Sequence, residues 1–187
     1  MKPIHLCTAL LTLAATPALA DPPGWTVDKG KSEVSFSGQH VGMDFKGQFG
    51  QWDATIQFDP ADLAHSSAKV VFQMATAKTA DATETDRLTD EEWLNPAKFP
   101  TGTFTSTSIT SSGGNAYVAK GNLVLKGKSL PASLPFTLTI SGNSATLKGS
   151  TTVDRLVYGI GTQSDESGTY VSKDIAISVD LVATKKP

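Results

Sequence analysis

The sequence contains very little cysteine, and Cys7 is the only one. Because Cys7 lies within the first twenty residues, residues 21–187 contain none. That stretch can form neither a disulfide nor a thiolate metal site, so burial of apolar surface must hold it together. It is long enough to do so as one domain, since a chain of about 150 residues buries roughly two thirds of its unfolded surface.

Basic residues are also few, and they are nowhere clustered. Without Lys2, 15 Lys and Arg stand against 18 Asp and Glu, a net charge of −3 with His neutral. Nucleic-acid-binding domains carry a basic patch, and anionic membranes attract clustered Lys and Arg. We therefore expect no nucleic-acid partner and no long-range attraction to anionic lipid headgroups.

The usual signatures of catalysis and metal binding are missing as well. His40 and His65 are the only histidines after residue 20, and no H-E-x-x-H or H-x-E pattern contains them. There is no G-x-S-x-G motif, and no pair of acids stands apart from those in turns. We expect no metal, no cofactor and no enzyme activity, although a lipid-transforming barrel stays open as an alternative.

No apolar run is long enough to span a membrane as a helix, which takes about 20 apolar residues. The longest, Leu6–Ala15, follows a positive start at Lys2 and precedes Ala18-Leu19-Ala20. A basic start, an apolar middle and an A-x-A site are typical of a secretory signal peptide. We therefore predict a signal peptide over residues 1–20, cleaved after Ala20, and one domain over residues 21–187.

What the sequence does contain is alternation of apolar and polar residues with a period of two, which is typical of strands with one face on a core. Turn-forming clusters such as Ser111–Asn115 and Ser141–Asn143 separate the runs. We predict about eight strands in an antiparallel sandwich or barrel. The clearest alternating apolar residues are Val34 and Phe36; Trp52, Ala54, Ile56 and Phe58; Val70 and Phe72; Leu123 and Leu125; Phe136, Leu138 and Ile140; and Ile175, Ile177, Val179 and Leu181.

One segment interrupts this pattern. Thr89 followed by Glu92 has the form of a capping box, which predicts a short helix over Thr89–Leu94 that ends at Asn95-Pro96. A helix this short is unstable unless its apolar side chains dock on another surface. We therefore predict that residues 90–99 form a lid over one end of the barrel.

Barrels of about eight strands are either filled by their own side chains or hold one small ligand, and composition does not decide between the two. A filled barrel would be a structural or interaction module, for instance one that serves a membrane redox partner. A lipid-modifying enzyme would need a titratable pair inside its cavity.

Several motifs, in order along the chain, resemble the YceI-like family of exported lipid-binding proteins. The similarity extends from Trp25 to about Ala183, nearly all of residues 21–187. Its motifs are Trp25 to Asp28, Ser32-x-Val34-x-Phe36, His40, Gly47-x-Phe49, Asp86-Arg87, Trp93-Leu94-Asn95, Lys98 to Phe104, Gly121 to Gly127, and Asp154-Arg155-x-x-Tyr158-Gly159-Ile160-Gly161.

The resemblance implies an all-β, antiparallel, eight-stranded lipocalin-like barrel in the periplasm. It also implies a cavity that holds one isoprenoid lipid or isoprenoid quinone as ligand, with dimers in some members. We expect a membrane-associated redox or lipid-pathway protein as a partner. His40, Asp86, Arg87, Arg155 and Tyr158 are candidates for binding a head group, whereas Phe58 and Val179 are predicted to be plain core. The predicted ligand-binding residues are Phe36, His40, Phe45, Trp52, Phe72, Trp93, Leu94, Phe99, Phe104, Leu125, Phe136, Leu138, Arg155 and Tyr158.

Overall fold

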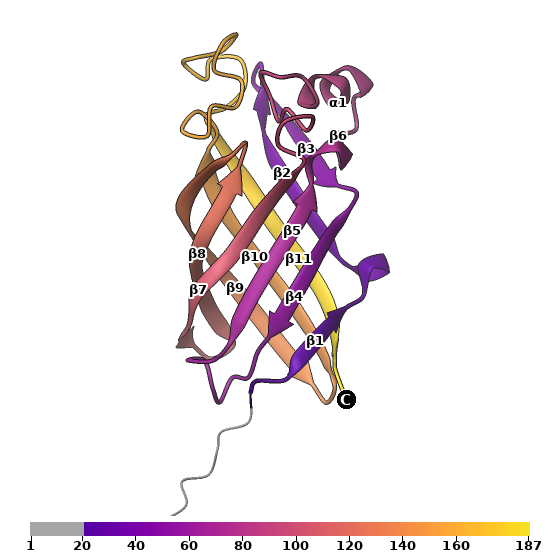
Figure 1. The fold of residues 1–187 in the computed structure, drawn as a ribbon, viewed down its shortest axis with the longest axis vertical. Helices are drawn as coiled ribbons and strands as arrows, with labels where there is room; N and C mark the ends of the chain where they lie inside the picture. Colours follow the sequence, from indigo (N-terminus) through magenta and orange to yellow (C-terminus); the bar gives the residue numbers. More distant parts are fainter. Residues whose placement is uncertain (1–20) are drawn as a thin grey trace, which may run out of the picture.

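A single antiparallel sheet coils into a barrel in the computed structural model, which describes residues 21–187 (Figure 1). The predicted signal peptide lies outside the described residues. The strands are β1 Gly24–Val27, β2 Glu33–His40, β3 Met43–Phe49, β4 Trp52–Gln57, β5 Ser67–Gln73, β6 Ala77–Thr79, β7 Thr101–Gly113, β8 Ala116–Leu125, β9 Lys128–Ser141, β10 Ser144–Asp154 and β11 Asp174–Lys185. The helices are α1 Ala82–Leu88 and the 3-10 turns η1 Lys29–Lys31 and η2 Met74–Thr76.

The barrel closes through eight strands, in the order β1-β4-β5-β7-β8-β9-β10-β11, with β11 pairing back onto β1. The strand β11 also pairs with β2, further along the same edge. The remaining strands continue three of the eight: β2 extends β1, β3 extends β4, and β6 extends β5, after breaks at η1, at Gly50-Gln51 and at η2. The predicted eight-stranded antiparallel barrel is confirmed.

Glycine-containing turns set the hairpin registers, as predicted. The β9–β10 hairpin turns at Gly142-Asn143 and the β7–β8 hairpin at Gly114-Asn115, and both glycines have positive φ. Two-residue turns of this kind match the twist of antiparallel strands. The inward residues of each strand then alternate with Ser, Thr and Lys on the outer face, so the barrel core is built from the apolar half of each strand.

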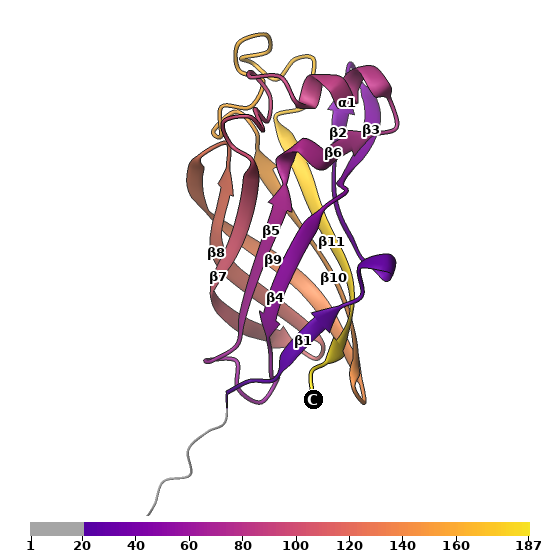
Figure 2. The ribbon, with the colours of Figure 1, turned by 45° about the vertical axis from the view of Figure 1, so that its right-hand side comes forward.

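One end of the barrel, which we call the mouth, is covered by irregular chain. There β6 pairs only with β3. Between β6 and β7 the chain forms α1 and then residues 89–100, and we call residues 89–100 the cover segment. Residues 155–173, the mouth loop, lie at the same end, opposite the chain's C-terminus (Figures 1 and 2). No helix within residues 21–187 is long and apolar enough to cross a membrane.

The predicted helix over Thr89–Leu94 is wrong in its position. The helix is α1, and its N-cap is Asp81, whose carboxylate accepts from the amide of Glu84 at 2.9 Å. Thr89 is instead the C-cap, and its hydroxyl donates to the carbonyl of Asp86 at 2.8 Å. Asp81-x-x-Glu84 starts the helix two turns earlier than the Thr89 pattern would, so Thr89 falls at its end.

Candidate functional site

The barrel interior contains a cavity of about 110 Å³. Its lining extends along the barrel axis. Trp25 and Ala183 lie at the end opposite the mouth, and Val34 and Phe72 lie nearer the mouth. Every lining side chain is apolar except Thr151, and none is titratable. Such a surface can bury an apolar chain, but it offers a polar solute almost no hydrogen-bonding partners.

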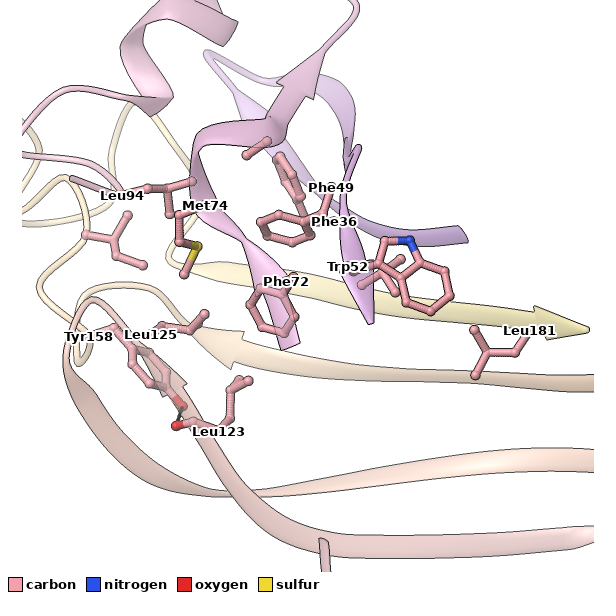
Figure 3. Packing of buried hydrophobic residues seen from close by; sticks show 13 residues of the cluster. Phe36, Phe49, Trp52, Phe72, Met74, Leu94, Leu123, Leu125, Tyr158 and Leu181 are labelled. Atoms are coloured by element: carbon pink, nitrogen blue, oxygen red, sulfur yellow. Dashed lines mark hydrogen bonds between the residues drawn. The ribbon is translucent and has the colours of Figure 1, made fainter. Parts of the chain in front are cut away.

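An apolar cluster extends from the cavity wall, where it includes Val34, Phe72 and Leu181, toward the mouth (Figure 3). Its members come from strands, η2, the cover segment and the mouth loop. The rings of Phe36 and Phe49 are 5.3 Å apart, and those of Phe49 and Phe72 are 4.8 Å apart. Met74 beside them has no exposed surface. Leu94 docks here from the cover segment, which therefore closes the mouth as the lid prediction expected.

The other end of the cavity is closed by a second apolar cluster. Phe58 and Phe136 meet edge to face at 6.5 Å, and Tyr117 stacks on Phe136 at 5.5 Å. The indole N–H of Trp25 donates to the carbonyl of Phe58 at 3.0 Å, so the polar atom of this buried ring has a partner.

At the mouth, a groove of about 510 Å³ combines polar and apolar groups. It lies among α1, the β2–β3 hairpin, the cover segment and the mouth loop. His40 Nδ1 lies 3.0 Å from Glu84 Oε1 on one side, and Phe45 and Trp93 supply apolar surface. At the mouth, polar side chains therefore meet a large hollow.

Arg155 organises the mouth loop from within. Its side chain is 3% exposed and pairs with Asp165, at 2.6 Å between Nη2 and Oδ2. The guanidinium also donates to five backbone carbonyls, of which Ile160 at 2.7 Å and Val171 at 2.8 Å are the nearest.

Asp165 is held as an anion. Burial by itself raises the pKa of this carboxyl, but the amides of Val171, Tyr170 and Thr169, together with the charge of Arg155, outweigh burial and bring the pKa below its ordinary value. The Asp165 carboxylate thus fixes three successive amides of the loop at once.

Glu92 joins the cover segment to the mouth loop. Its carboxylate accepts from the hydroxyl and amide of Ser164 and the amide of Gln163, and these bonds lower its pKa. Its carbonyl accepts from the amide of Gly161 and from Lys126 Nζ. Glu92 is therefore a cross-link between segments, which the capping-box interpretation did not foresee.

The predicted ligand-binding residues fall into four groups. Phe72, Phe104, Phe136 and Leu138 line the cavity. Phe36, Trp52, Leu94, Leu125 and Tyr158 belong to the cluster below the mouth, where burial raises the pKa of the Tyr158 hydroxyl. His40, Phe45 and Trp93 line the mouth groove.

The last two predicted residues lie elsewhere. Phe99 packs against Gly127, at the β8–β9 hairpin. Arg155 is buried in the mouth loop, where its guanidinium lies 5.5 Å from the centre of the Trp93 ring, and it lines neither the cavity nor the mouth groove.

Sequence reasoning missed much of the cavity wall. Phe58 and Val179, expected to be plain core, line the cavity. So do Ile177 and Leu181 of β11 and Leu147 of β10, none of which the sequence singled out as ligand-binding. The alternating pattern marks all of these as inward-facing, but only strand pairing shows which inward residues reach the open part of the lumen.

Within residues 21–187, no group of three His, Cys, Asp or Glu side chains is placed to hold a metal ion.

Arg87, a candidate for binding a head group, lines the mouth groove. It pairs with Asp90 at 3.4 Å, where both side chains are largely exposed. Such exposed pairs contribute little to stability.

Two relatives of known sequence are similar to this chain over most of its length. A UPF0312 protein of Yersinia pestis (strain Pestoides F) is 32% identical over 138 residues, covering 72% of this chain and 70% of the relative. A UPF0312 protein of Vibrio cholerae (strain O395) is 27% identical over 134 residues, covering 70% and 71%.

Solved structures share the fold. BcnA of Burkholderia cenocepacia has a TM-score of 0.82 at 30% identity and covers 85% of this chain and 100% of its own. A polyisoprenoid binding domain of Saccharophagus degradans, implicated in plant cell wall breakdown, has a TM-score of 0.65 at 13% identity, covering 87% and 98%. The family profile described as YceI-like domain matches residues 25–183. The chain therefore belongs to the YceI-like domain family.

Proposed function

We propose that this protein binds a long isoprenoid chain, either a polyprenyl lipid or the tail of an isoprenoid quinone, in the lumen of its barrel and stores or transports it unchanged. The observation that carries the proposal is the enclosed cavity whose lining is apolar apart from Thr151. An isoprenoid chain has no hydrogen-bonding groups, so burial at roughly 25 cal/mol per Å² of apolar surface is enough to hold it. The S. degradans relative, a polyisoprenoid binding domain, supports the same ligand class.

The polar end of the ligand would lie in the mouth groove, and the bound chain would then displace Met74 and Leu94 where it passes from the groove into the lumen. His40, Glu84 and Arg87 are among the polar residues that line this hollow. No titratable group lines the cavity itself, which supports binding without chemistry.

A second candidate is a barrel filled by its own side chains that acts as a structural or interaction module for a membrane redox partner. The observation that favours it is the volume of about 110 Å³, below the roughly 300–1,000 Å³ of common small-molecule sites. Under our leading proposal, lumen side chains must therefore shift when the chain of the ligand is bound.

We also propose a periplasmic location, because residues 1–20 have the pattern of a cleaved signal peptide. The lipid would then be delivered to a membrane-associated redox or lipid-pathway protein. Fractionation of cells that produce the full chain tests the location, and retention in the cytoplasm would contradict it.

The lumen is tested by Phe136→Asp. Phe136 is 6% exposed and lines the cavity, so the substitution places an unpaired carboxylate there. We expect binding of solanesol, a long polyprenyl alcohol, to be lost. The matched control is Thr137→Asp, which adds the same charge one residue along on the exposed outer face and should bind as the wild type does. Equal binding by both variants, each shown to be folded by circular dichroism, would contradict the proposal.

A further inference from the structure

Two neighbouring strands of the barrel wall separate part of the way along their length. The strands β9 and β10 pair from their hairpin only as far as Phe136 and Gly149. Beyond that pair, β9 continues with β8 as its partner, and β10 continues with β11. Residues 128–135 of β9 and 150–154 of β10 therefore border each other without pairing, and we call this boundary the seam.

Two prolines explain where the pairing stops. Along a strand of an antiparallel sheet, successive amides point alternately to the two neighbours. Leu138 in β9 donates to the carbonyl of Asn115, on the β8 side, so the even-numbered residues of β9 donate toward β8. The odd-numbered residues then face β10, and Pro131 and Pro135 are among them. Proline has no N–H, so two of the donors that would close the seam do not exist.

The seam borders the cavity from both sides. Ala132 and Leu134 of β9 and Thr151 of β10 all line the cavity, and all three are only half-buried. On β8, Ala119 is the register partner of Leu134 and lines the same cavity, yet it is 3% exposed. Lining residues away from the seam, such as Val70 and Ile177, are half-buried too, so the seam is distinguished by its missing ladder and not by exposure.

The outer surface is also hollowed at the point where the seam begins. A groove of about 1050 Å³ lies over this face, and Pro135, Gly149 and Ser150 border it. Phe136 lines both this outer groove and the inner cavity. At the end of the ladder the barrel wall between the inner cavity and the outer groove is therefore one residue thick.

The two ends of the lumen are closed more firmly than the seam. A chain that enters through the mouth must displace Met74, which has no exposed surface, and Leu94, which is 8% exposed. At the opposite end it must displace the ring cluster around Phe58. At the seam no strand-to-strand ladder has to be broken.

We propose that the seam is a side portal through which the apolar chain of the ligand passes into the lumen. The inference rests on the proposed function, because it assumes a ligand with a long apolar chain. It assigns Pro131 and Pro135 the role of keeping the portal open, and Ala132 and Thr151 a place at its inner edge.

The opening itself is tested without any ligand. Single cysteines replace Ala132 or Ala119 in a Cys7→Ser background, so that each protein carries one thiol. Both positions are inward-facing alanines of the same cavity, and only Ala132 is at the seam. We expect the thiol of Ala132→Cys to react with a charged methanethiosulfonate reagent at least tenfold faster than that of Ala119→Cys. Equal rates would overturn the portal.

The passage of ligand is tested by restoring the missing donors. The double variant Pro131→Thr/Pro135→Thr supplies two N–H groups toward β10 on exposed, outward positions. We expect uptake of radiolabelled solanesol from phosphatidylcholine vesicles to slow at least tenfold, with unchanged final loading. Pro60→Thr, at an exposed proline outside the strands, is the control and should take up solanesol at the wild-type rate.

The outcomes separate the portal from the proposed function. Wild-type uptake rates in the double variant would overturn the portal and leave lumen binding intact. An absence of solanesol uptake by the wild type would contradict the proposed function itself.

Discussion

The substitution Asp165→Asn should loosen the mouth loop. Asp165 is 4% exposed at its side chain, and its carboxylate binds Arg155 and three backbone amides. Removing one partner of a buried pair costs about 3–5 kcal/mol, because the other charge stays buried without compensation. At about 1.4 kcal/mol per factor of ten, the lower figure corresponds to roughly two orders of magnitude in local opening.

Amide hydrogen exchange is the suitable assay, because the loop can open while the barrel stays folded. The amides of Thr169, Tyr170 and Val171 should exchange about a hundredfold faster in the variant, whereas amides in β7 and β8 keep their rates. Glu166→Gln, an exposed neighbour, is the control. Protection of the three amides equal to that in Glu166→Gln would refute the reasoning.

The same carboxylate makes the stability of the mouth loop depend on pH, and the lowered pKa of Asp165 determines the direction of that dependence. The pKa of Asp165 is lower in the folded protein than its ordinary value, so its stabilising contribution is fully present above that ordinary value. The contribution is lost as the pH falls through the folded pKa, that is, below about pH 4. The difference in loop protection between the wild type and Asp165→Asn should therefore shrink in acid.

Three further substitutions test other parts of the account. Val41 has φ 51° in the two-residue β2–β3 turn, a left-handed conformation that is strained for valine and easier for asparagine. Val41→Asn should therefore raise the free energy of unfolding by about 1 kcal/mol in urea titrations, and a loss of stability would contradict this reasoning. Ala68→Leu fills part of the cavity wall and should weaken solanesol binding, whereas Lys69→Leu, on the outer face, should not. Met74→Ala should lower the free energy of unfolding by about 2–5 kcal/mol, and a change below 1 kcal/mol would show that the site is not packed as described.

The barrel was predictable because its signals are local. Period-two alternation requires only the sequence, and glycine turns such as Gly142 mark the hairpins. The helix position was not predictable, because Asp81-x-x-Glu84 and Thr89-x-x-Glu92 are equally good capping patterns. Long-range partners decided between them, since the carboxylate of Glu92 binds Ser164, 72 residues away.

The site was predictable only in outline, for a similar reason. The aromatic residues indicate an apolar interior, but which residues line the cavity depends on which strands are neighbours. Val179 lines the cavity for this reason, although its position in the sequence did not show it. The Arg155–Asp165 pair lies within irregular chain that carries no periodic signal. The prolines of β9 are visible in the sequence, yet their meaning depends on the register that points their nitrogens toward β10.

The most direct test of the central claim is mass spectrometry of the organic extract of the protein purified from its native host. The account predicts a polyprenyl lipid or an isoprenoid quinone in amounts close to one molecule per chain, and its loss in Phe136→Asp but not in Thr137→Asp. Repeated extracts without any isoprenoid species would contradict the account and favour a barrel filled by its own side chains.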